Sequence, residues 1–95
     1  MKKSDSLQRL RAEIDRLDGE LLRLLNQRAQ LGADVCRLKR AAGLPICDPE
    51  REAEVIGRAR QANRGPLDIR AIENIFRQII EETRKLEEQQ TVAAE

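Results

Sequence analysis

The sequence contains no histidine, tryptophan or tyrosine, and Phe76 is its one aromatic residue. Without histidine, catalysis by a histidine acid–base group or a histidine-containing triad is excluded. Cys36 and Cys47 do not have the spacing of metal ligands, so a zinc site is close to excluded and both thiols are expected to be reduced and inert. The lack of aromatic residues and a net charge of only +1 disfavour nucleic-acid binding.

Long apolar runs are also absent. No stretch reaches the length of a membrane-spanning helix, and the first six residues lack the apolar core of a signal peptide, so we expect a cytoplasmic protein. Only five glycines and three prolines occur among the 95 residues, and good helix formers dominate the rest. The composition therefore predicts a single all-α domain over residues 1–95.

Three helices, one long and two shorter, are expected. Their ranges are about 7–42, 49–62 and 69–89, with disordered ends at 1–5 and 91–95. Asp48 and Asp68 can cap the second and third helices, and Pro49 suits the first helical position. Gly19 and Gly32 weaken the first helix slightly but do not end it.

The first helix carries an apolar seam with one charged member. Ten positions follow a three-four spacing, and all but Arg28 are apolar: Leu7, Leu10, Ile14, Leu17, Leu21, Leu24, Arg28, Leu31, Val35 and Leu38. A charge buried without a partner costs several kcal/mol, so an anion should meet Arg28 inside a bundle. Lys39 points the same way ~16 Å further along the axis, which suggests a pocket for a small, multiply charged anion.

The unequal helix lengths predict a homodimer. The first helix would span ~54 Å, against ~21 Å and ~33 Å for the other two. The shorter helices cannot cover the whole seam, so we expect a second chain to pair with it in an intertwined bundle. Arg11 lies at the outer edge of the seam, ~25 Å from Arg28 on one rigid helix. An antiparallel or crossed partner helix would bring Arg11 to the other chain's Arg28.

Each polar residue near these helices also has an ordinary structural interpretation. Arg28 could fix the register of a coiled coil, and Lys39 could stabilise the end of its helix. Arg11 could be a surface charge, and Arg51 and Glu52 could form a local ion pair of little worth. Helix stripes often tolerate a threonine such as Thr83, and Glu87 could face solvent. That all of these hold together is improbable, and the combined pattern favours a binding site.

Five sequence blocks carry a resemblance to a known family. They are Leu10-Arg11 with Ile14 and Leu17-Asp18, Leu24-Leu25-Asn26-Gln27-Arg28, Val35-Cys36-Arg37-Leu38-Lys39, Pro45-Ile46-Cys47-Asp48-Pro49-Glu50-Arg51-Glu52, and Ile79-Ile80-Glu81-Glu82-Thr83. In these blocks the chain closely resembles the all-helical chorismate mutases, which are intertwined dimers. The resemblance covers about residues 7–88. It implies rearrangement of chorismate to prephenate, on the route to phenylalanine and tyrosine, without a cofactor.

The resemblance also implies a role for each candidate residue. Arg28 and Arg11 of the partner subunit would bind the two substrate carboxylates as planar forks. Lys39 would bind the enolpyruvyl side and donate to the ether oxygen, where negative charge grows as the C–O bond breaks. Glu52 and the backbone of Asp48 would receive the ring hydroxyl.

Three further residues complete the implied site. Arg51 would add positive potential or orient Glu52, and Thr83 would bind near the ring carboxylate. Many relatives have serine in place of Thr83, which keeps the hydroxyl, and glutamine in place of Glu87. Because the ether oxygen only accepts hydrogen bonds, Glu87 must be protonated to help. Burial favours the protonated form of Glu87, and a nearby Lys39 favours the ionised form. Because the protonated form is the one that helps, we expect activity to rise towards acidic pH. Glu87→Gln should flatten the dependence of activity on pH.

Other functions fit the same sequence. An isochorismate pyruvate lyase would use the same cationic pocket. The shape of the pocket and of a lid over residues 40–47 would decide between the lyase and the mutase. The intact set of Asp48, Arg51 and Glu52 favours the mutase. A non-enzymatic dimerising helical module is the second alternative. In that case Arg28→Leu would stabilise the protein without loss of its role. A mutase stimulated by a non-covalent partner enzyme is the third.

Overall fold

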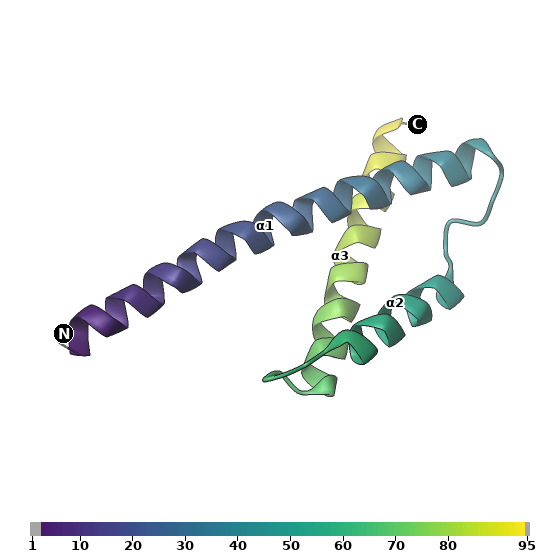
Figure 1. Ribbon diagram of the computed structural model, residues 1–95. Helices are drawn as coiled ribbons and strands as arrows, with labels where there is room; N and C mark the ends of the chain where they lie inside the picture. The colour runs from purple at the N-terminus through teal and green to yellow at the C-terminus, as the bar shows by residue number, and fades with distance from the viewer. Residues whose placement is uncertain (1–2, 95) are drawn as a thin grey trace. The chain divides into compact units, whose positions relative to one another are not determined.

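The computed structural model describes residues 3–94, with side chains up to residue 90, and it contains three helices (Figure 1). They are α1 (Lys3–Ala41), α2 (Pro49–Ala62) and α3 (Ile69–Ala94). No strand occurs among the described residues. The predicted all-α fold with one long and two shorter helices is therefore confirmed.

The chain divides into two compact units, Met1–Gln30 and Leu31–Glu95. The first unit consists of the amino-terminal part of α1. The second contains the last turns of α1 together with α2 and α3. One domain over the whole chain stays a prediction.

Helix α1 begins earlier than predicted, at Lys3 rather than near residues 6–7. Asp5 lies in its first turn, where a carboxylate stabilises the positive end of the helix dipole. Its carboxyl end has the two hydrogen bonds of a Schellman motif. The amide of Gly43 donates to the Arg40 carbonyl at 3.2 Å, and that of Leu44 donates to the Lys39 carbonyl at 2.8 Å. Gly43 has a φ of 70°, the left-handed conformation that this motif requires.

The predicted caps of α2 and α3 are confirmed. Asp48 accepts a hydrogen bond from the Arg51 amide at 3.1 Å, and Asp68 accepts one from the Ala71 amide at 2.7 Å. Helix α3 continues to Ala94 instead of ending near residue 89, because no glycine or proline follows Pro66. The helices thus include residues 3–5 and 91–94, which were predicted to be disordered, whereas residues 1–2 and 95 lie outside the described part.

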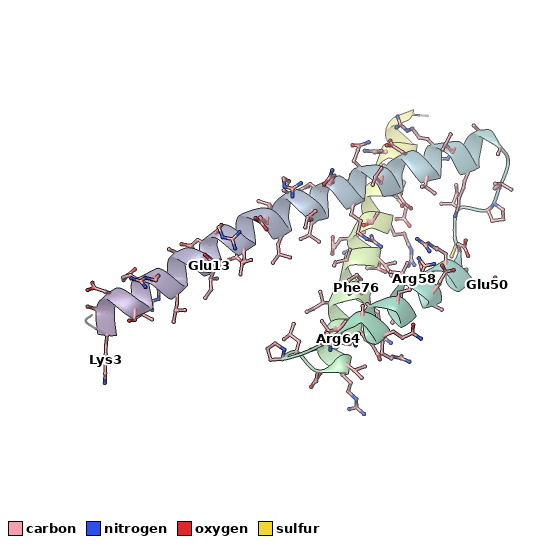
Figure 2. The ribbon with its side chains drawn as sticks, in the orientation of Figure 1. Lys3, Glu13, Glu50, Arg58, Arg64 and Phe76 are labelled. Carbon is pink, nitrogen blue, oxygen red and sulfur yellow. The ribbon has the colours of Figure 1, made fainter. Side chains whose placement is uncertain are left out.

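Helices α2 and α3 pack side by side (Figure 1). Arg60 of α2 pairs with Glu73 near the start of α3, and Glu52 near the start of α2 pairs with Arg84 far along α3, so the two helices run antiparallel. Phe76, labelled in Figure 2, is half-buried. Other half-buried apolar residues of this pair are Val55, Ile56, Ala59, Ile72, Ile79 and Ile80. Burial of one face of each helix is the main stabilising contribution in this unit.

Most of the apolar seam of α1 is exposed in the single chain. Leu10, Leu31 and Leu38 are 64%, 62% and 71% exposed, respectively. Only Ala33 and Cys36 of α1 are buried among the described residues. None of the described helices is long and apolar enough to cross a membrane. A seam of large apolar side chains in water is energetically costly and typical of an interaction surface.

Candidate active site

Lys39 lies at the end of α1, where its ammonium group faces the start of α2. Its Nζ is 3.9 Å from the Asp48 carboxylate and donates to the carbonyl of Ile46 at 3.5 Å. The Lys39 side chain is only 24% exposed. These contacts tie the loop between α1 and α2 to α1. They bring together Lys39 and Asp48, two of the residues predicted to bind the substrate.

Arg51 and Glu52 do not have the local ion pair that their sequence proximity suggested. Arg51 instead pairs with Glu54 one turn further along α2, at 2.8 Å. Glu52 forms an ion pair with Arg84 of α3. The two side chains point to different partners because successive residues of a helix lie about 100° apart around its axis.

Arg84 was not among the residues predicted for the site, and it contacts one of them. Its Nη2 donates to Glu52, and its Nη1 donates to Glu81 at 3.2 Å. The hydrogen bond with Glu52, followed by the charge of the same carboxylate, raises the pKa of Arg84 above its usual value. Arg84 is therefore a cation at every pH at which an enzyme assay is practical. It also holds the Glu52 carboxylate from the opposite helix.

Thr83 and Glu87 lie beside α1 at Gly32. A Cβ atom placed on Gly32 would be 2.6 Å from Cγ2 of Thr83 and 3.2 Å from Oε1 of Glu87. The Thr83 hydroxyl donates to the Ile79 carbonyl at 2.8 Å, and Thr83 is the one buried polar residue among those described. Glu87 is half-buried. Gly32 thus allows α1 to approach both predicted site residues closely.

Arg11 and Arg28 belong to the first unit, so their place in the site is a matter for proposal. Arg11 is exposed and Arg28 half-buried. Arg16 of the same helix, by contrast, forms ion pairs with Glu13 and Glu20. No ion pair of Arg11 or Arg28 is found within the described part of this unit. Two arginines on or beside an apolar seam, without an ion pair in the described part of their unit, suit the binding of an external anion.

The second unit contains six of the eight predicted residues and places five of them in three local groups, while Arg51 pairs with Glu54 instead. It joins Lys39 to Asp48 through the loop, holds Glu52 on α2, and brings Thr83 and Glu87 to α1. A cation, an acceptor carboxylate and a half-buried carboxyl or hydroxyl can orient a polar anion and stabilise charge that develops on it.

Comparison with known proteins identifies the family. A profile of chorismate mutase type II matches residues 10–88, most of the chain. The chain belongs to this family. A "Chorismate mutase" from Methanocaldococcus jannaschii is 34% identical, with 90% of this chain and 87% of the relative covered. The chorismate mutase of Thermus thermophilus (form II) has a TM-score of 0.86 at 39% identity, covering 90% of this chain and 97% of that chain.

Two other relatives show how varied the family is. A bifunctional chorismate mutase/prephenate dehydratase from Aquifex aeolicus is 41% identical over 94% of this chain, and the chain spans about a quarter of that relative's length (26%). A "4-amino-4-deoxychorismate mutase" from Streptomyces venezuelae is 39% identical over 93% of this chain and 86% of the relative. Family members thus differ in domain composition and in substrate.

Proposed function

We propose that this protein is a chorismate mutase that rearranges chorismate to prephenate. The observation that carries the proposal is the family match over residues 10–88, which includes all eight candidate residues. The rearrangement breaks a C–O bond and forms a C–C bond within one molecule. It requires no proton transfer and no nucleophile, so a chain without histidine can catalyse it. The structure of the chorismate mutase of Helicobacter pylori in complex with prephenate, 32% identical to this chain with a TM-score of 0.81, supports the same ligand class here.

Catalysis in this proposal rests on orientation and charge. Arg28 and Arg11 bind the two carboxylates and hold the flexible substrate in a compact, near-attack shape. Lys39 stabilises the negative charge that grows on the ether oxygen in the transition state. The ion pair of Lys39 with Asp48 keeps the ammonium in place before the substrate binds, which limits the reorganisation that the reaction needs. Glu52 accepts a hydrogen bond from the ring hydroxyl, and the backbone of Asp48 contacts the same hydroxyl.

A homodimer completes the site in this proposal. The exposed seam of α1 supports pairing of two long helices, because each chain would cover the other's leucines. Crossed pairing would bring Arg11 of the partner subunit to Arg28. Within one chain, Arg11 and Arg28 are too far apart along the helix to bind the same small molecule. A non-covalent partner enzyme and a cytoplasmic location stay predictions.

Turnover assays test the proposed function. The purified protein, with its oligomeric state measured by light scattering, is incubated with chorismate, and the loss of chorismate and gain of prephenate are followed. We expect saturable conversion by a dimer. Isochorismate serves as the matched control substrate. Release of pyruvate from isochorismate without conversion of chorismate would contradict the mutase and support the lyase. A folded dimer that acts on neither substrate would contradict both enzymes and leave the helical interaction module.

Activity is expected to rise as the pH falls from neutral to mildly acidic values. Protonated Glu87 can donate to the ether oxygen, whereas ionised Glu87 repels the developing charge. Substitution Glu87→Gln supplies a donor at every pH and should flatten the profile of log(kcat/KM). The exposed Glu88 is a suitable control, since Glu88→Gln should keep the slope of the native protein. An identical slope in the Glu87→Gln protein would exclude Glu87 from the site.

A further inference from the structure

The ion pair between Glu52 and Arg84 joins α2 to α3 at the proposed ring-binding end of the site. Arg84 follows Thr83 directly in α3, and Glu52 is the carboxylate proposed to accept the ring hydroxyl. Both side chains are partly exposed, at 39% for Arg84 and 34% for Glu52, so a bound molecule can still reach the carboxylate. Arg84 is thus a cation held against the group that would contact the substrate ring.

We propose that Arg84 makes the site selective for a hydroxyl over an amino group on the substrate ring. The inference rests on the proposed function and names what Glu52 accepts. A carboxylate accepts hydrogen bonds from a hydroxyl and from an ammonium group, but the ammonium gains more from the negative charge because a full charge–charge attraction is added. Arg84 neutralises that charge and repels a second cation, while a neutral hydroxyl loses little.

The second contact of Arg84 supports this role. Its Nη1 binds Glu81, one turn earlier on α3, while Nη2 binds Glu52. Two carboxylates hold the guanidinium from two sides, so a substrate amine does not easily displace it. Because its pKa is raised, Arg84 also stays charged wherever an aliphatic amine is protonated. The repulsion is therefore present throughout the assay range.

The test compares chorismate with 4-amino-4-deoxychorismate, in which an amine replaces the ring hydroxyl. We expect the native dimer to prefer chorismate in kcat/KM. In the Arg84→Gln protein the ratio of the kcat/KM for chorismate to that for the amine should fall about tenfold, because glutamine keeps a hydrogen-bond donor but carries no charge. Arg84→Lys keeps the charge and should retain most of the preference.

The chain offers a matched control. Arg60 also forms an ion pair between α2 and α3, with Glu73 at 2.9 Å, and it lies eight residues, ~12 Å, beyond Glu52 along α2. Arg60→Gln removes a similar interhelical pair without touching the site, so it should leave the ratio unchanged. A fall in the ratio for both variants would indicate a general packing effect and overturn the inference.

A measurement on the native protein keeps the inference testable if Arg84→Gln does not fold. Salt screens the repulsion between Arg84 and the amine, so the preference for chorismate should narrow as ionic strength rises from about 0.05 M to about 0.5 M. The role of Arg84 would be overturned if the ratio of the two kcat/KM values were unchanged in Arg84→Gln, or if the native preference for chorismate did not depend on salt. Turnover of chorismate by the native protein would still support the mutase in either case. Native protein that converts neither compound would overturn the mutase and this inference together.

Discussion

Replacing Arg28 with leucine is expected to lower turnover strongly while the protein stays folded. Arg28 is the one charged member of the apolar seam, and leucine there continues the pattern of its neighbours. Loss of a fork that binds a substrate carboxylate should lower kcat/KM about 10³-fold. The free energy of unfolding should stay equal or increase, because replacing a half-buried charge with a packed apolar side chain removes a desolvation cost.

Steady-state kinetics and thermal unfolding at one fixed protein concentration check both halves of this prediction. Arg23 is the control, since it is exposed on the same helix and its guanidinium donates only to Gln27, at 3.3 Å. Arg23→Leu should change kcat/KM little. If Arg28→Leu retained full activity, Arg28 would serve only to set helix register. If it lost folding as well as activity, the residue would have a structural role that the seam pattern hides.

The sequence predicted the bounds of α2 well because the signals that set them are local. Asp48 caps the helix through an amide three residues away, and Pro49 fits the first turn, so both act within a few residues of the boundary. The outer ends of α1 and α3 lack such signals. The predicted helices were therefore too short at these ends, although the first turn of α1 contains a favourable carboxylate, Asp5.

The pairing of Glu52 with Arg84 could not be predicted from local sequence. Arg84 lies in a run of charged residues between Glu81 and Glu88, where i,i+3 and i,i+4 pairs on a solvated helix face are the usual arrangement. Its pairing with Glu52 depends on the antiparallel packing of α2 and α3. A signal was nonetheless present, since a helical hairpin with a short connection brings the start of α2 towards the later turns of α3.

Gly32 was interpreted from sequence as a slightly unfavourable helix residue, and the structure gives it a specific purpose. The close approach depends on which residue of α3 lies opposite, which no local pattern of α1 records. Thr83 and Glu87 lie one turn apart on α3, and both lie close to the position that a Cβ atom on Gly32 would occupy. At Gly19, the other glycine of α1, an added Cβ would have no heavy atom within 4 Å apart from its adjacent residues and the nearby backbone of its own helix, which fits the original interpretation.

Substitution Gly32→Ala is expected to lower kcat/KM about 10²-fold, because a small displacement of groups around a substrate has effects of this size. The added Cβ would lie 2.6 Å from Cγ2 of Thr83, closer than real Cβ contacts, so α1 or α3 has to shift. Thr83 cannot easily rotate away, since it is buried and its hydroxyl is bonded to Ile79. Kinetics with chorismate and thermal unfolding of the same samples provide the measurement.

The control for Gly32→Ala is Gly57→Ala, which lies within α2 in the same unit and has open space around its Cβ position. Alanine there should raise the free energy of unfolding by ~0.8 kcal/mol through helix propensity and leave kcat/KM unchanged. At Gly32 the same gain is opposed by the clash with Thr83, so stability should rise less or fall. Equal stabilisation at both positions with full activity would mean that α1 and α3 tolerate a side chain between them, and that the close approach at Gly32 does not position Thr83 and Glu87.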